Sequence, residues 1–114
     1  LSHINLIRDQ KLSSGFKSKF GLIDTDDKST KNIMGMYQKA ILSKVNNSEL
    51  KISWKMKDNS VVELSRDEFI DLGDDVLEFS QNCYAYSWML KEAISKCENY
   101  DILDAINILD GWPE

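Results

Sequence analysis

The sequence is poor in the residues that most often carry chemistry or mark a special class of protein. Its 114 residues include two cysteines, one histidine and one proline. The single histidine, His3, has no cysteine or histidine cluster around it, which excludes a zinc site of the usual composition. The lone proline is Pro113, so no proline interrupts an earlier helix or strand. No stretch approaches the roughly 20 apolar residues of a membrane span, so no membrane contact is expected.

The distribution of charge along the chain also does not indicate a highly charged partner. The net charge is −5, and acidic and basic residues are intermixed along the chain. A basic stripe, which is the electrostatic footprint of nucleic-acid binding, is missing, so nucleic acid is not expected as a partner. Cys83 and Cys97 fall in one predicted helix and lie roughly 21 Å apart along its axis, too far to form a disulfide within it. We expect both cysteines to be small, buried apolar residues; a disulfide to another molecule is the alternative.

What the chain does have is enough apolar sequence for one core. With 42% hydrophobic residues in 114, a single domain covering residues 1–114 is expected. The chain starts at Leu1 without Met, which favours a fragment or a processed chain. No repeat, low-complexity tract or interdomain linker is visible.

The first half of the chain predicts two helices separated by a short β segment. Residues 2–14 form a loosely apolar helix, and Gly15 suits the left-handed residue that follows a helix. Residues 16–25 are β-like and can form a small hairpin that turns at residues 18–19. Asp26 has the short acceptor side chain of a helix N-cap and precedes a run of period 3.6, which ends in the polar loop 46–48.

The stretch "WKMKDNSVVELSRDEF" predicts a β-hairpin that leads straight into a helix. Apolar residues alternate with polar ones on both sides of residues 58–60, where Asn59 tolerates the positive φ of a tight turn. Trp54 lies on the apolar face. Ser65 and Glu68 then match the capping box S-x-x-E, in which each residue satisfies a backbone amide of the other. The helix therefore begins where the hairpin ends.

The helix from Ser65 to Cys97 is the strongest signal in the sequence. Apolar residues recur at spacings of three and four, through Phe69, Leu72, Val76, Phe79, Cys83, Tyr86, Leu90, Ala93 and Cys97. Such a helix would be roughly 48 Å long, which exceeds the ~35 Å diameter of a compact domain of this length. It must either break, near Gly73 or residues 80–82, or extend beyond the body of the domain. A final short helix at 99–110 and a packed terminal Trp112 complete the predicted α+β fold, in the order α-β-α-β-β-α-α.

Aromatic side chains crowd one part of the long helix and exceed what one core can cover. Because successive helical residues are about 100° apart, Tyr84, Tyr86 and Trp88 cannot all face one core. Tyr84 and Trp88 share a side through their i,i+4 spacing, and Tyr86 belongs to the main apolar stripe. Together with Phe79 they are candidates for binding a partner, since exposed apolar patches usually mark an interface. A second contact within the chain and an aromatic platform for sugars or bases are the alternatives.

No pattern in the sequence predicts a catalytic, cofactor-binding or metal-binding site. Asp24, Asp26 and Asp27 lack the spacing of a calcium loop and suit the start of a helix. The long helix carries a second acidic group, formed by Asp71, Asp74, Asp75 and Glu78. These side chains could act in acid/base chemistry only inside a cleft that shifts their pKa values. We expect them instead to form a solvated face of the helix. The chain is therefore expected not to be an enzyme.

Four blocks of the sequence resemble a known family. They are "RDQKLSSGF" at 8–16, "TDDKSTKNIMG" at 25–35, "WKMKDNSVVELSRDEF" at 54–69 and "GWP" at 111–113. Their order and residues are similar to those of an uncharacterised domain at the C-terminus of tailed-bacteriophage tail-fibre and tail-fibre-assembly proteins. Asp27 departs from the proline that many members carry at this point, which changes only the helix start. The central helix is richer in aromatic residues than the usual alanine-rich version.

The resemblance implies the C-terminal domain of a larger phage protein, without enzymatic activity. It implies a role in virion assembly, as a chaperone, structural or oligomerisation module that contacts tail-fibre or other tail proteins. A dimer or trimer is a reasonable expectation, because symmetric homo-oligomers are common. The implied location is the virion tail, or the host cytoplasm during assembly. Receptor or glycan binding at a fibre tip through Trp88, Tyr84 and Tyr86 is the alternative.

Overall fold

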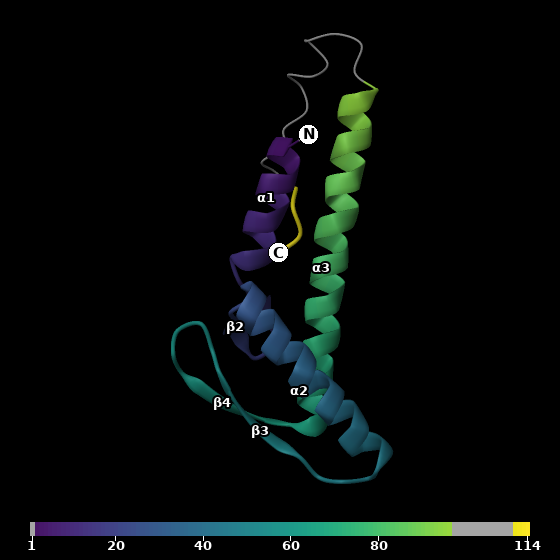
Figure 1. The fold of residues 1–114 in the computed structure, drawn as a ribbon. Coiled ribbons are helices and arrows are strands. Elements are labelled where there is room, and N and C mark those ends of the chain that lie inside the picture. Colours follow the sequence, from purple (N-terminus) through teal and green to yellow (C-terminus); the bar gives the residue numbers. More distant parts are fainter. Residues whose placement is uncertain (1, 97–110) are drawn as a thin grey trace.

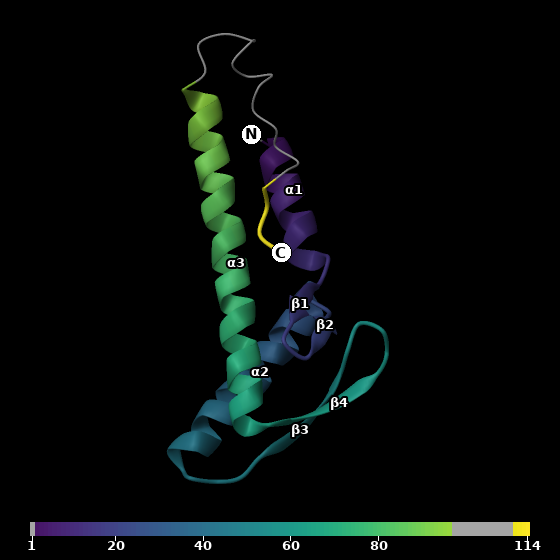
Figure 2. The same cartoon turned by 180° about the vertical axis from the view of Figure 1, so that it is seen from behind.

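The computed structural model describes residues 2–96 and 111–114, which form three α-helices and two β-hairpins (Figure 1; Figure 2 shows the reverse side). The elements are α1 (Ser2–Ser13), β1 (Phe16–Ser18), β2 (Gly21–Ile23), α2 (Asp27–Val45), β3 (Lys51–Lys55), β4 (Val61–Ser65) and α3 (Arg66–Ser95). The predicted α+β class is confirmed, with the first β segment opened into a hairpin of its own. The helix predicted at 99–110, and Cys97, lie outside the described residues.

The first hairpin follows α1 through a left-handed glycine, as predicted. Gly15 has φ +109°, and its N–H donates to Thr25 Oγ1 over 2.9 Å. β1 and β2 pair antiparallel from Phe16↔Ile23 to Ser18↔Gly21. The turn therefore occupies residues 19–20, one position later than predicted, and Ser18 Oγ donates across it to the Gly21 carbonyl at 2.6 Å.

The start of α2 is where predicted, but its cap differs. Asp26 occupies the N-cap position with extended backbone, yet its side chain accepts no capping hydrogen bond from the helix backbone. The Ser29 hydroxyl is the main cause that lowers the pKa of Asp26. Asp26 therefore interacts chiefly with the Ser29 hydroxyl, and the predicted capping hydrogen bond to its carboxylate is not formed.

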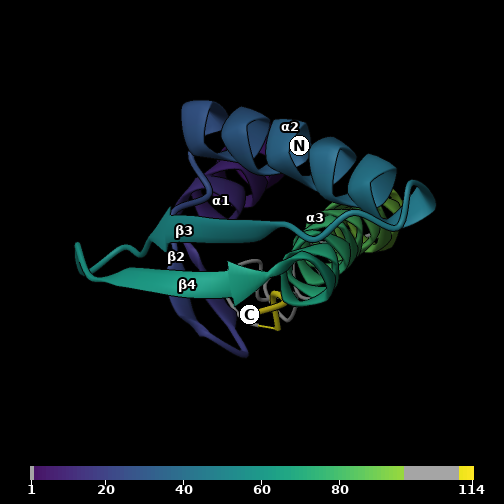
Figure 3. The same ribbon diagram turned by 90° about the horizontal axis from the view of Figure 1, so that it is seen from below.

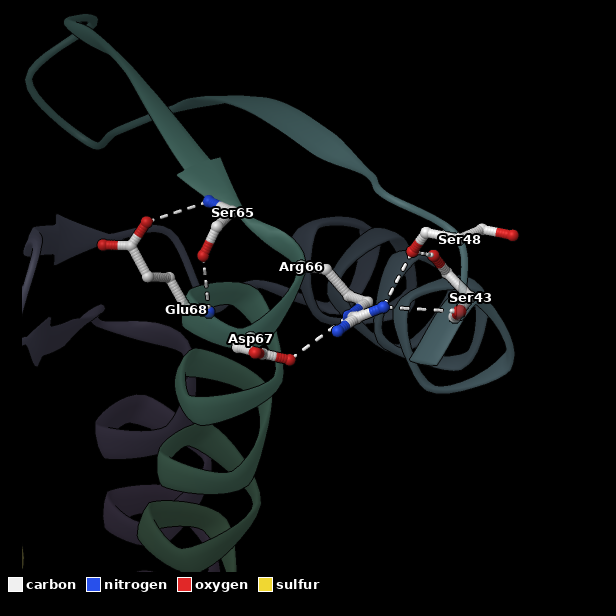
Figure 4. A network of polar contacts seen from close by, with 6 residues as sticks. All are labelled: Ser43, Ser48, Ser65, Arg66, Asp67 and Glu68. Atoms are coloured by element: carbon white, nitrogen blue, oxygen red, sulfur yellow. Dashed lines mark hydrogen bonds and ion pairs between the residues drawn. The ribbon is translucent and has the colours of Figure 1, made fainter. Parts of the chain in front are cut away.

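The second hairpin and α3 share one residue. β3 and β4 pair antiparallel from Lys51↔Ser65 to Lys55↔Val61, and Asn59 has φ +71° in the turn, as predicted. Ser65 is both the last residue of β4 and the N-cap of α3. Its Oγ accepts from Glu68 N at 3.1 Å, and its own N–H donates to Glu68 Oε1 at 2.9 Å, which confirms the capping box (Figure 4).

Arg66, next to the capping box, joins the start of α3 to the end of α2. Its guanidinium Nη1 donates to the carbonyl of Ser48 at 2.7 Å and to that of Ser43 at 3.5 Å (Figure 4). Carbonyls at a helix C-terminus have no partner within the helix, so a cation there satisfies them and complements the helix dipole. The loop between α2 and β3 is thereby held against the base of α3.

The long helix is unbroken. α3 has 30 residues and therefore a length of about 45 Å. Neither Gly73 nor residues 80–82 interrupts it. At Gly73 the ring of Tyr37 from α2 lies directly on the helix backbone, and Tyr37 Oη donates to Asp74 Oδ1 over 2.5 Å. The glycine expected to weaken α3 is instead the point where α2 crosses it.

Buried apolar residues form two separate clusters, one at each half of α3. The lower cluster joins α2, both hairpins and the first half of α3, and includes Phe69, on which Trp54 packs edge-on at 5.0 Å. The upper cluster joins α1, the second half of α3 and the chain end; its buried members are Ile4, Ile7, Leu90 and Trp112. The radius of gyration, 17.6 Å, exceeds the ~13 Å of a compact chain of this length. α3 therefore does outgrow its base, but α1 accompanies it (Figure 1).

Trp112 closes the upper cluster, as the sequence predicted. It is 7% exposed and meets Tyr86 edge-on, with the ring centroids 4.8 Å apart. Gly111 before it has φ +84° and lies so close to the Tyr86 hydroxyl that a Cβ would be 2.3 Å from that oxygen. Residues 111–114 therefore lie between α1 and α3 (Figure 2).

Candidate protein-binding surface

Among the described residues, none covers one apolar face of α3 above the crossing with α2. Leu77 is 46% exposed, Tyr84 38% and Trp88 57%. Their spacing of seven and four residues brings all three to the same side of the helix. α2 covers this side lower down, at Gly73, and α1 packs against a different side, that of Cys83, Ser87 and Leu90. We call Leu77, Tyr84 and Trp88 the α3 stripe.

The aromatic part of the stripe is held in place by α1. The rings of Tyr84 and Trp88 are 6.2 Å apart between centroids, at an interplanar angle of 40°. The guanidinium of Arg8 lies over the Tyr84 ring, 4.7 Å from its centroid, in a cation–π contact. Arg8 is itself fixed by an ion pair to Asp9 at 2.9 Å and a hydrogen bond to Asn5 Oδ1 at 3.2 Å. Tyr84 is thus exposed but oriented.

A groove opens beside Tyr84, where the end of α1, the start of α2 and the middle of α3 meet. Two adjoining open hollows, of about 520 and 330 Å³, share Leu12, Thr25, Asp27 and Tyr84 as lining residues. The acidic residues that line the groove are Asp9, Asp26 and Asp27, and the basic residue among its lining residues is Lys31. The groove therefore carries an excess of negative charge, and its aromatic lining residue, Tyr84, belongs to the α3 stripe.

Two of the four residues predicted to bind a partner serve the chain's own packing instead. Phe79 is 4% exposed and packs on Phe16, with the ring centroids 5.1 Å apart. Tyr86 lies against Gly111 and Trp112. Both residues point to the side of α3 that the chain itself covers, so only the predicted Tyr84 and Trp88 belong to the exposed surface.

Sequence reasoning missed two members of this surface for different reasons. Leu77 shares a face with Tyr84 and Trp88 by spacing alone, so helical periodicity could have grouped it with them. Arg8 could not have been found, because it is 76 positions from Tyr84 in the sequence and only the packing of α1 on α3 brings them together.

Two of the four acidic residues of α3 considered for chemistry, Asp74 and Asp75, are engaged in structural contacts. Asp74 accepts the hydrogen bond from Tyr37, which raises the pKa of that tyrosine, and Asp75 pairs with Lys19 at 3.8 Å. Within residues 2–96 and 111–114, no group of His, Cys, Asp and Glu side chains is arranged to hold a metal ion. Burial raises the pKa of the Cys83 thiol, which makes it a poor nucleophile. No helix in this part of the chain is long and apolar enough to span a membrane.

The chain was compared with known families, curated proteins and solved structures. No curated protein and no solved structure matches it. One family model, described as a domain of unknown function (DUF4376), matches residues 1–107. Because that match covers nearly the whole chain, the protein belongs to the DUF4376 family of domains of unknown function.

Proposed function

We propose that this chain is a non-enzymatic, protein-binding domain of a tailed-bacteriophage tail or tail-fibre-associated protein. The phage role is supported by the four ordered sequence blocks, which resemble a C-terminal domain of such proteins. The binding role is supported by the α3 stripe, in which three large apolar side chains on one side of the helix are exposed. This exposed stripe is the observation that carries the proposal.

The composition of the surface suits a protein partner. Tryptophan, tyrosine and arginine dominate the binding energy of protein interfaces, and Trp88, Tyr84 and Arg8 lie together here. Removing an apolar side chain from water contributes roughly 1.5–3 kcal/mol per residue. Because Arg8 already restrains Tyr84, little further ordering of that ring is needed when a partner binds.

The domain would act in virion assembly or as a structural and oligomerisation module. Its partner would be a tail-fibre protein, another tail component or a second copy of the chain. An elongated rod with one uncovered apolar stripe suits side-by-side contact with another helix, in which residues at i, i+7 and i+11 act as anchors.

The test compares Trp88→Ala with Met89→Ala in pull-downs against the tail-fibre protein encoded in the same genome. Met89 is a matched control, because it is 54% exposed and adjacent in sequence but about 100° away around α3. We expect Trp88→Ala to lose binding and Met89→Ala to keep it. A chain that stays monomeric by light scattering at tens of micromolar, and that binds equally weakly with and without Trp88, would refute the proposal.

Glycan binding is a second candidate that one observation favours. The Tyr84 ring, which contacts the exposed Trp88, lines a groove together with Asp9 and Asp27. Their carboxylates can accept hydrogen bonds from sugar hydroxyls. A glycan array probed with the wild type and with Asp27→Asn would distinguish it. Hits that disappear in the variant would favour a receptor-binding role, and an array without hits would exclude it.

A further inference from the structure

The outer edge of β3 carries backbone groups that are not used within the hairpin. Opposed residues of an antiparallel pair alternately do and do not exchange N–H···O bonds. Met56 N donates to the Ser60 carbonyl at 2.8 Å, which sets the phase of this alternation. In the observed register, Ser53 and Lys55 then belong to pairs that exchange no bonds, so their N–H and C=O groups point away from β4.

Two contacts elsewhere in the hairpin agree with this phase. Lys57 lies on the same outer edge as Ser53 and Lys55, and its N–H donates to the carbonyl of Leu22 in β2 at 2.9 Å. Ser65 lies on the outer edge of β4, and its N–H leaves the hairpin for Glu68. β2 thus accepts one backbone hydrogen bond just beyond the end of β3, at Lys57. Toward the start of β3, at Ser53 and Lys55, the edge has no backbone partner among the described residues.

An open groove runs along this free edge. It has a volume of about 510 Å³ and separates β3 from the first turns of α2; its lining residues are Asp24, Lys28, Ser29, Asn32, Ser53, Trp54 and Lys55. In the view along α3, β3 lies between β4 and α2, so the edge that faces the groove is the edge without a partner strand (Figure 3). An exposed edge of this kind is a template for another strand.

We propose that an extended segment of a partner protein adds as a strand to the outer edge of β3, inside this groove. From Lys51 to Lys55 the edge is about 13 Å long, enough for backbone bonds to Ser53 and Lys55. One face of the added strand meets the half-buried Trp54 and carries an apolar residue. Its other face lies beside Lys55 and beside Lys51, which also pairs with Glu63 at 3.9 Å, and carries acidic residues that complement the lysine charge.

This site is separate from the α3 stripe and does not rest on the phage role. The experiment uses the whole chain and a library of random 12-residue linear peptides, followed by synthetic copies of the selected sequences. Ser53→Pro removes the outward N–H of β3. Glu63→Pro is the matched control, because Glu63 is directly opposite Ser53 and loses an outward N–H on the other edge.

We expect peptides with alternating apolar and acidic residues to be selected. They should bind Ser53→Pro at least about tenfold more weakly than wild type, and Glu63→Pro within about twofold, since only the first variant loses a bond to the added strand. In the wild type, bound peptide should slow hydrogen exchange at the amides of Ser53 and Lys55. This second readout needs no variant and remains informative if Ser53→Pro fails to fold.

Several outcomes would overturn the proposal. A library that yields no enriched peptide would do so, as would peptides that bind Ser53→Pro and wild type equally. Peptides that leave the Ser53 and Lys55 amides unprotected, or that lose affinity in Trp88→Ala instead, would place binding elsewhere. A dimer in sedimentation that Ser53→Pro dissociates would make a second copy of the chain the occupant of the edge.

Discussion

The two helical glycines Gly35 and Gly73 should respond in opposite directions to alanine. Glycine costs a helix interior roughly 0.5–1 kcal/mol relative to alanine, so propensity alone predicts that both substitutions stabilise the chain. A Cβ at Gly35 has no atom within 4 Å, and that gain should be realised in full. A Cβ at Gly73 would lie 2.1 Å from Tyr37 Cδ2, which requires the ring to move.

The magnitude at Gly73 follows from two opposing terms. Overpacking costs typically 1–3 kcal/mol, and displacement of Tyr37 also weakens its hydrogen bond to Asp74. After the propensity gain is subtracted, Gly73→Ala should lower the free energy of unfolding by about 1–2 kcal/mol. With 114 residues, that corresponds to about 4 °C in Tm per kcal/mol.

Urea unfolding of the two variants, followed by circular dichroism, measures both values. A double-mutant cycle isolates the cause, because Gly73→Ala made in a Tyr37→Ala background meets no ring and should become stabilising. If Gly73→Ala stabilises the wild type as much as Gly35→Ala does, then α2 does not cross α3 at this glycine and the described packing of the lower cluster is incorrect.

Three further predictions concern the chain end, a cap and a turn. Trp112→Ala should lower the free energy of unfolding by about 3–5 kcal/mol. It should also speed hydrogen exchange in α1 while the β3–β4 hairpin stays protected, because Trp112 belongs to the upper cluster alone. Equal loss of protection in both regions would contradict two separate clusters. Ser65→Ala should cost about 1 kcal/mol in chemical unfolding, and an unchanged midpoint would deny the capping box a role. The Ser60 hydroxyl and amide lower the pKa of Asp58. The stability that Asp58 contributes is therefore present above its ordinary pKa and is lost as the pH falls through the lowered value. An NMR titration of Asp58 that shows no lowered pKa in the wild type, or no rise of that pKa in Ser60→Ala, would contradict this.

Local signals in the sequence were sufficient for most of the secondary structure. The capping box at Ser65, the left-handed Gly15 and the positive φ of Asn59 all follow from interactions within a few residues, and all three are found. The packed Trp112 was also predicted, because an apolar chain end has little alternative to burial.

The candidate surface depended on contacts that no local pattern contains. Gly73 was expected to weaken α3 because glycine does so in isolated helices, but the ring of Tyr37 requires that space. Phe79 and Tyr86 belong by spacing to the main apolar face of the long helix, and the positions of β1 and of the chain end show what covers them. Arg8 joins the surface through tertiary packing.

Photo-crosslinking in phage-infected cells tests whether the α3 stripe contacts another protein during assembly. The photoreactive residue p-benzoylphenylalanine would replace the native side chain at position 88 or, as the control, at position 89. We predict a crosslink to a tail or tail-fibre protein from position 88, on the stripe, and none from position 89, on the neighbouring face. No crosslink from position 88, or equal crosslinks from the two positions, would contradict a binding role for the stripe.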